Sequence, residues 1–344
     1  MPEEVKLTQF SHGAGCGCKI APAVLEKILA PTLKAEKNTS LLVGYDTKDD
    51  AAVYDIGNGR AIISTTDFFM PIVDDAFDFG RIAAANSISD VYAMGGKPLM
   101  AVAILGWPVE KLPAELAQKV LDGARAVCKE AGIPLAGGHS IDSTEPIFGL
   151  AVTGEVDIKN IKRNSTATEG CKLFLTKPLG VGMITTAHKR GLAPKEDFEQ
   201  AVKMMTRLNV LGYEYGKLDC VKAMTDVTGF GLLGHLIEMC EGSGLSATIE
   251  YSKIPLLPSI PNYVSKMIYP DITFRNWKSY ESKVVGIGPD SLLTLCDPQT
   301  SGGLLVAVDP RYENKFITLA KNHHLDLKSF GVITAKNTTL VTVI

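Results

Sequence analysis

The alternation of hydrophobic and polar positions predicts short strands and longer helices in the first half of the chain. Strands are predicted at 41–43, 61–64, 100–105 and 148–156, and helices over 80–96 and 113–132. Both predicted helices stop at glycine, a residue that commonly follows a helix C-terminus.

A second group of elements follows in the second half of the chain. The pattern predicts strands at 171–177, 302–309 and 339–344, and helices over 196–216, 228–244 and 311–324. Helices and strands mixed in both halves predict an α+β protein made of two mixed α/β domains.

The length of the chain and a polar stretch near its middle predict two domains. At 344 residues it exceeds the size of an ordinary single core, so two domains are expected. The polar stretch 157–170 separates two predicted strands and places the boundary. We therefore expect a flexible glycine-rich segment over 1–20, an N-terminal domain over 21–160 and a C-terminal domain over 161–344. The proline-rich stretch 254–290 is predicted to be an irregular excursion.

Composition narrows the class of protein. Apolar residues make up 46% and charged residues 21%, as in a folded globular chain, and the net charge of −3 disfavours nucleic acid or an acidic membrane surface as the main partner. No apolar run has the length of a spanning helix, and MPEEVKLTQF lacks the features of a secretory signal. Seven cysteines, an odd number, suit reduced thiols, so the cytoplasm is the expected compartment. Cys128, Cys171 and Cys240 lie in apolar segments and are expected to be packing residues.

The stretch SHGAGCGCKI, residues 11–20, crowds two cysteines and a lysine among glycines. Glycines allow such a loop to move or to approach a ligand closely, and Lys19 favours a thiolate at Cys16 or Cys18. A disordered tail is the plain alternative. Zinc and thioredoxin-type chemistry both need two residues between the cysteines, whereas one stands here. A nucleophilic or substrate-carrying thiol on a flexible loop remains as the hypothesis.

Aspartates recur at the ends of apolar segments, in TKDDAAVY, STTDFFMP, NSISDVYAMGG and MTDVTGFG. Any one of them is explained by a helix cap or a turn. Together, Asp49, Asp50, Asp67, Asp90 and Asp226 suggest oxygen ligands for a hard cation such as Mg²⁺, which usually binds with phosphates. The Walker and kinase glycine patterns are missing from the sequence, so a nucleotide site would be of another type.

Three further stretches are candidates. LAGGHSID, residues 135–142, offers backbone N–H groups to phosphate, although a plain turn is its default interpretation. His235 lies on an apolar helix and is expected to be structural. The turn QTSGG, residues 299–303, is expected to hold the backbone close to another element that the sequence does not identify.

From Leu7 to about Val308, the chain closely resembles the selenophosphate synthetase family of the aminoimidazole ribonucleotide synthetase-like superfamily. The resemblance rests on these segments in this order: SHGAGCGCK, DDAAVY, STTDFFMPIVDD, NSISDVYAMGGKP, AGGHSID, GLAVTGEV, MTDVTGFGLLGH and CDPQTSGGLL. The resemblance implies Mg²⁺-dependent conversion of ATP, selenide and water to selenophosphate, AMP and orthophosphate. It also implies homodimers that pair through the N-terminal domains and share ATP sites. The product would supply selenium for selenocysteine and modified tRNA.

The resemblance also implies roles for single residues. Cys16 matches the catalytic cysteine, Lys19 matches the lysine needed beside it and near the nucleotide, and Cys18 is dispensable by analogy. Asp50, Asp90 and Asp226 match the Mg²⁺ ligands. The positions that match nucleotide contacts are Thr47, Lys48, Asp49, Asp67 and Asp90, with Gly138, His139 and Ser140 reaching ATP across the dimer. Many members carry arginine at Lys48, so its single ammonium group puts affinity in question.

On this hypothesis the segment 11–20 is a mobile lid that excludes water and carries Cys16 and Lys19. Two alternatives stay open. A sister ATP enzyme of the superfamily, such as a thiamine-phosphate kinase or a purine-pathway synthetase, would share the aspartates without GCGCK. A nucleotide-binding selenium sensor would need neither Cys16 nor Lys19.

Overall fold

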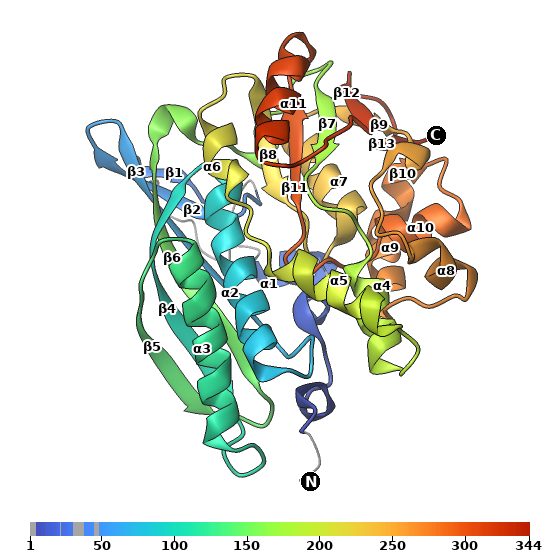
Figure 1. The fold of residues 1–344 in the computed structure, drawn as a ribbon. Coiled ribbons are helices and arrows are strands. Elements are labelled where there is room, and N and C mark those ends of the chain that lie inside the picture. Colours follow the sequence, from blue (N-terminus) through green and yellow to red (C-terminus); the bar gives the residue numbers. More distant parts are fainter. Residues whose placement is uncertain (1–4, 21, 30–37, 45–47) are drawn as a thin grey trace.

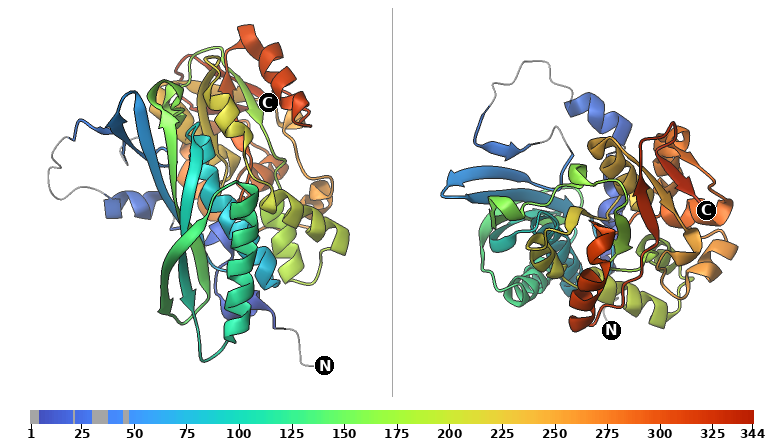
Figure 2. Two further views of the ribbon diagram at one scale, coloured as in Figure 1. Left: turned by 60° about the vertical axis from the view of Figure 1, so that its left-hand side comes forward. Right: turned by 90° about the horizontal axis from the view of Figure 1, so that it is seen from above.

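The computed structural model describes residues 5–20, 22–29, 38–44 and 48–344. Two mixed sheets lie on either side of helix α2 (Ala76–Ala93), as Figures 1 and 2 show. This helix packs against β3 and β6 of the first sheet and against β8 of the second. The α+β class predicted from the sequence is therefore confirmed. Within the described ranges, no helix is long and apolar enough to cross a membrane.

The first sheet has six strands in the order β1-β2-β3-β6-β4-β5, and only the β4–β5 pair is parallel. The strands are β1 (Leu41–Val43), β2 (Ala52–Gly57), β3 (Arg60–Phe69), β4 (Lys97–Trp107), β5 (Leu135–Asp142) and β6 (Ile147–Asp157). Helices α2 and α3 (Ala114–Glu130) cover one face. A Cβ atom on Gly80 would clash with the carbonyl oxygen of Val120, and one on Gly123 with that of Phe77. Two glycines thus let these helices touch backbone to backbone.

The second sheet has seven strands in the order β10-β13-β9-β12-β7-β11-β8. They are β7 (Lys172–Leu175), β8 (Val221–Asp226), β9 (Ser246–Ile249), β10 (Val284–Val285), β11 (Leu304–Val308), β12 (Gly331–Thr334) and β13 (Val341–Val343). Every residue of β11 is buried, which explains its unbroken apolar sequence LLVAV.

The helices of this half surround the second sheet and contact the first half of the chain. They are α4 (Val181–Lys189), α5 (Lys195–Thr206), α6 (Leu211–Gly216), α7 (Gly231–Ser243), α8 (Ile260–Ser265), α9 (Ile272–Tyr280), α10 (Pro289–Leu295) and α11 (Glu313–Asn322). Helices α5 and α6 both pack on α2. The core around α2 is therefore shared between the two halves.

Three sequence predictions differ from the structure. The helix predicted over 196–216 is two helices, α5 and α6, because the buried amide of Asn209 between them donates to Ser89 Oγ and to the carbonyl of Gly302. The stretch 254–290 is not irregular, since it contains α8, α9 and the start of α10. GGHS is not a turn; it lies inside β5.

The N-terminal segment forms two short 3-10 turns, η1 (Leu7–Phe10) and η2 (Gly15–Cys18), followed by α1 (Pro22–Leu29). The hydroxyl of Thr8 donates to Asp74 at 2.6 Å, and the N–H of Gly15 donates to the carbonyl of Met70 at 3.0 Å. These bonds hold the segment against the end of β3. The glycine-rich stretch is therefore packed in place in this structure, with Cys16 fully buried.

Candidate functional site

Three aspartates from distant parts of the sequence converge beside the N-terminal segment. Asp50 lies just before β2, Asp90 near the end of α2, and Asp226 is the last residue of β8. One carboxylate oxygen from each lies within 4.8 Å of the others. The sheet edges and α2 bring them together, which no local sequence pattern specifies.

Hydrogen bonds from threonines fix two of these carboxylates, but two oxygens of the cluster have no such partner in the described part of the chain. Thr225 Oγ1 donates to Asp50 Oδ1 at 2.7 Å, and Thr65 Oγ1 donates to Asp90 Oδ2 at 2.5 Å. Among the described residues, Asp50 Oδ2 and Asp226 Oδ2 are buried without a hydrogen-bond partner. Buried oxygens of this kind are costly unless a cation or a proton satisfies them.

The electrostatics of the cluster point the same way. Burial raises the pKa of Asp50 and of Asp90 well above the ordinary value, and repulsion from Asp226 raises both further. Burial also raises the pKa of Asp226 to about 6, although the Ser89 hydroxyl and Lys19 oppose this shift. Like charges held this close favour a bound cation. An all-oxygen donor set of this kind suits Mg²⁺.

Beside the cluster, Lys19 joins the N-terminal segment to the carboxylates. Its Nζ lies 3.6 Å from Asp67 Oδ2, and about a third of its side chain is exposed. Burial lowers the pKa of Lys19, but attraction to Asp67 and to Cys16 outweighs this, so the pKa lies above its ordinary value. Lys19 is therefore a permanent positive charge at this site.

Cys16 is connected to the same carboxylate through Asn86. The thiol of Cys16 donates to Asn86 Oδ1 at 3.3 Å, and Asn86 Nδ2 donates to Asp67 Oδ2 at 2.5 Å. This chain of contacts links the sulfur to Asp67, the carboxylate that Lys19 also contacts.

The turn QTSGG, which belongs to the other half of the chain, forms hydrogen bonds with the Cys16 turn and with Asn86. Thr300 Oγ1 accepts from the N–H of Cys16 at 3.1 Å, and the N–H of Ser301 donates to Asn86 Oδ1 at 2.8 Å. Gly15 has φ +51°, and a Cβ atom there would clash with Thr300 Oγ1. The turn QTSGG therefore meets the cysteine turn through Thr300, and its glycines Gly302 and Gly303 approach the backbone of Val227 and Lys177.

A cavity of about 330 Å³, the acidic pocket, opens onto these groups. Seven of the predicted site residues line it, namely Lys19, Lys48, Asp49, Asp50, Asp67, Asp90 and Asp226, together with Leu25, Thr65, Thr66, Thr228, Phe230, His235 and Glu238. Asn164 anchors its rim, because its N–H donates to Asp49 Oδ1 and its side-chain amide to the carbonyl of Lys48. Thr47, another predicted nucleotide contact, lies outside the described residues.

Gly138, His139 and Ser140 are not brought to this pocket within one chain. They lie exposed on β5, the edge strand of the first sheet, and are not among the described residues that line the acidic pocket. His235 is buried as expected, and its Nε2 accepts from the N–H of Thr228 at 3.1 Å. Because burial lowers its pKa to about 3, His235 is neutral where it borders the pocket.

Several residues of the site escaped sequence reasoning. Asn86, Thr65, Thr225 and Thr300 each hold one of the predicted groups by a hydrogen bond. A signal existed for Asn86, because it lies four residues before Asp90 and therefore on the same helix face. Thr65 and Thr225 carry no comparable signal, since strands are rich in threonine for packing reasons alone, and Thr300 lies in a turn whose partner is far away in the sequence.

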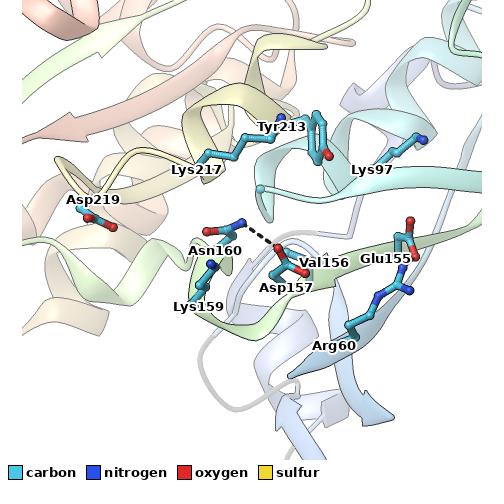
Figure 3. A pocket seen from close by; sticks show the side chains of 11 residues that line it. Arg60, Lys97, Glu155, Val156, Asp157, Lys159, Asn160, Tyr213, Lys217 and Asp219 are labelled. Carbon is cyan, nitrogen blue, oxygen red and sulfur yellow. Dashed lines mark hydrogen bonds and ion pairs between the residues drawn. The ribbon is translucent and has the colours of Figure 1, made fainter. Parts of the chain in front are cut away.

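Another cavity, the remote pocket of about 470 Å³, lies between the first sheet and α6 (Figure 3). Its charged side chains largely pair among themselves or with close neighbours. Arg60 contacts Glu155, Asn160 donates to Asp157, and Lys217 contacts Glu214. Among the described residues, no group of acidic or histidine side chains close enough to hold a metal ion lies in this pocket, so it is the weaker candidate.

Comparison with known families matches both halves of the chain. Residues 48–156 match the AIR synthase related protein N-terminal domain, and residues 168–344 match the AIR synthase related protein C-terminal domain.

Solved structures share the fold at low sequence identity. A thiamine-monophosphate kinase from Stenotrophomonas maltophilia has a TM-score of 0.67 at 20% identity, with 89% of this chain and 92% of that chain covered. The hydrogenase maturation protein HypE, solved in complex with ATP, has a TM-score of 0.62 at 17% identity, with 87% of this chain and 82% of that chain covered. These likenesses establish the architecture.

Sequence relatives are much more similar. The chain is 58% identical to a selenide, water dikinase of Photorhabdus laumondii over 331 residues, which cover 96% of this chain and 95% of the relative. It is 56% identical to those of Pseudomonas putida, with 100% of both chains covered, and of Escherichia coli, with 95% and 94% covered. The chain belongs to the selenide, water dikinase family.

Proposed function

We propose that this chain is a selenide, water dikinase, which converts ATP, selenide and water to selenophosphate, AMP and orthophosphate. Its relatives over the full length carry that name. The observation that carries the proposal is that a lysine and a carboxylate cluster line one cavity and that a cysteine of the same turn is linked through Asn86 to Asp67 of that cavity. A sister kinase needs the carboxylates but has no use for Cys16 and Lys19.

The acidic pocket would hold the phosphates of ATP together with Mg²⁺. Asp50, Asp90 and Asp226 would be the ligands, because their oxygens lie within 4.8 Å and two of them lack partners among the described residues. Bound there, Mg²⁺ would neutralise the charge that builds up between carboxylates and phosphates. Lys48 and Asp49, held by Asn164, would contact the nucleotide at the rim.

Lys19 and Cys16 would act at the side of the pocket that faces the N-terminal segment. Lys19 stays protonated beside Asp67, so it can stabilise negative charge on a transferred phosphoryl group. The thiol of Cys16, which donates to Asn86, would hold or deliver selenium. The glycines around them let the turn open and close over the reacting groups, which would exclude water.

We also propose that the protein is a homodimer that pairs through the open face of the first sheet. Helices α2 and α3 cover one face, whereas the other carries Tyr54, Ile56, Phe68, Met100 and Val102, each between 38% and 54% exposed. An apolar face of this kind is typical of an interface. Pairing there would bring β5, with Gly138, His139 and Ser140, next to the partner subunit.

The dimer proposal is tested by a double variant, Phe68→Glu with Val102→Glu, and by Val109→Glu as a matched control at an exposed valine outside the face. Sedimentation equilibrium should find a dimer for the wild type and the control. It should find a monomer with weakened ATP binding for the double variant. A wild-type protein that stays monomeric at micromolar concentration would contradict the proposal.

The buried thiols agree with a reducing compartment. Among the described residues, the thiols of Cys16, Cys128, Cys171, Cys220, Cys240 and Cys296 are buried and form no disulfide. We therefore place the enzyme in the cytoplasm, where thiols remain reduced.

The activity is tested by anaerobic ³¹P NMR of the purified protein with Mg-ATP, with and without selenide. The expected result is a selenophosphate signal that requires selenide, with AMP and orthophosphate in equal amounts. ADP as the sole nucleotide product would assign the protein to a sister kinase. Binding of ATP without turnover would assign it to the sensor class.

The role of Cys16 is tested in the same assay by Cys16→Ser, with Cys128→Ser as a control at a buried thiol of α3. Loss of selenophosphate in the first variant alone is expected. Full turnover by Cys16→Ser would show that the thiol takes no part in the reaction.

A further inference from the structure

A second cavity, the basic pocket of about 500 Å³, adjoins the Cys16 turn. Gly13, Ala14 and Gly17 of the N-terminal segment line it on one side, and residues of α4 and α9 line it on the other. Among the described residues, Lys19 is the only one that lines both this cavity and the acidic pocket. The turn that carries Cys16 is therefore the partition between two cavities.

The charge of the basic pocket is opposite to that of its neighbour. Lys189, Arg190 and Arg275 line it together with Lys19 and His12, against one aspartate, Asp271. His12 is offset by Glu145, whose carboxylate lies 2.8 Å from its Nδ1. Within the described ranges, no carboxylate lies within ion-pair distance of Lys189 or Arg275. A net positive field from such side chains concentrates small anions.

Steric room at the partition favours a small ligand. A Cβ atom on Gly17 would meet only Ile272 Cγ2 at 3.7 Å and Pro298 Cγ at 4.0 Å, which are ordinary contacts. By contrast, a Cβ atom on Gly15 would clash with Thr300 and Ile72, and one on Gly229 with the carbonyl oxygen of Cys16. The turn is thus tightly packed around Gly15 and Gly229 and looser at Gly17, which faces the basic pocket.

We propose that the basic pocket is the port through which selenide, a small anion at neutral pH, reaches Lys19 and the turn that carries Cys16. This inference rests on the proposed function. A route through the acidic pocket would take an anion past six carboxylates, those of Asp49, Asp50, Asp67, Asp90, Asp226 and Glu238, and past the bound triphosphate. The basic pocket reaches Lys19 from the side with the opposite charge. Selenide and nucleotide then approach the reacting groups from different cavities and do not exclude each other.

The kinetic test is the double variant Lys189→Gln with Arg275→Gln, which removes two charges that make no contact with the acidic pocket. We expect KM for selenide to rise about tenfold, with kcat and KM for ATP unchanged. The wild-type KM for selenide should also rise with salt, and the variant should lose most of that dependence. The matched control is Lys159→Gln with Lys217→Gln in the remote pocket, which should leave KM for selenide unchanged (Figure 3).

The same kinetic test distinguishes a port for selenide from a port for the anionic products. An unchanged KM for selenide in the double variant would overturn the proposal. A lower kcat with weaker product inhibition by inorganic phosphate, and no change in KM for selenide, would instead assign the pocket to product release and overturn it equally.

A second measurement does not depend on catalysis. Cys16 is alkylated with iodoacetate, an anion, or with neutral iodoacetamide, and mass spectrometry locates the modified residue. The iodoacetate-to-iodoacetamide rate ratio at Cys16 should fall severalfold in the double variant but not in the control. An unchanged rate ratio in the double variant would contradict the proposal that the basic pocket is the port. A wild-type protein without selenide-dependent turnover would contradict the proposed function, but the rate ratio could still be measured.

Discussion

The acidic and basic pockets lie on either side of one turn, yet they hold their charges by different physical means. In the acidic pocket the carboxylates are buried and close together, and burial with mutual repulsion raises their pKa values. In the basic pocket the cations come from the end of α4, the residue that follows it, and α9. Buried like charges require a counter-ion, whereas solvated charges act on what diffuses past. The comparison teaches that the first pocket is built to bind and the second to attract.

The largest effect on turnover is expected when an aspartate of the acidic pocket is replaced, and an aspartate of the basic pocket serves as the comparison. Asp226→Asn removes a buried carboxylate of the cluster, so turnover of Mg-ATP should fall about 100-fold or more. Asp271→Asn, in the basic pocket, should change turnover less than twofold. Steady-state kinetics and Mg²⁺-dependent thermal shifts measure both. Equal losses in the two variants would erase the distinction between the pockets.

A smaller effect is expected at the partition itself. Thr300→Val leaves the N–H of Cys16 without its acceptor, so the turn should lose its fixed position. Selenide-dependent turnover should fall about tenfold while KM for ATP stays unchanged, which corresponds to about 1.4 kcal/mol. Thr300→Ser keeps the hydroxyl and should restore turnover. If the serine variant is as slow as the valine variant, the hydrogen bond is not what positions Cys16.

The smallest effect on turnover is expected at an aspartate buried behind the basic pocket, where the change is one of stability. Asp297 Oδ2 accepts from the N–H of Gly182 and from Gln299 Nε2, and burial raises the pKa of Asp297 from 3.8 to about 8. Between these values the folded state holds a proton that the unfolded state has released. The free energy of unfolding should therefore fall as pH rises from about 4 to about 8, by up to about 1.4 kcal/mol per pH unit.

Asp297→Asn tests this slope, because an amide keeps an acceptor for Gly182 and Gln299 and carries no titrating proton. Urea unfolding at pH 5, 6, 7 and 8 should show a flatter dependence for the variant than for the wild type. Parallel curves would mean that burial alone does not hold a proton on this carboxyl, and that repulsion is needed, as in the acidic pocket.

The sequence pointed to those site residues whose neighbours along the chain mark them out, and it missed those whose role depends on distant contacts. Cys16 and Lys19 stand out because reactive groups are crowded among glycines, and each of the aspartates Asp50, Asp90 and Asp226 because it ends an apolar segment. Asn209 interrupts a predicted helix without any glycine or proline, since its reason is a bond to Ser89 in another helix. Thr300 has its role only because QTSGG meets a turn 284 residues earlier.

The sequence by itself determined the α+β class, most helices and strands, and the chemical types that the acidic pocket uses, because periodicity and residue chemistry are local properties. Only the tertiary structure decided that oxygens of three carboxylates lie within 4.8 Å of one another and that Asn86 and Thr300 hydrogen-bond to Cys16. It also decided that a second cavity of opposite charge adjoins the Cys16 turn. Those facts depend on contacts between residues far apart along the chain. Such contacts are set by the packing of both sheets against α2, which no segment encodes alone.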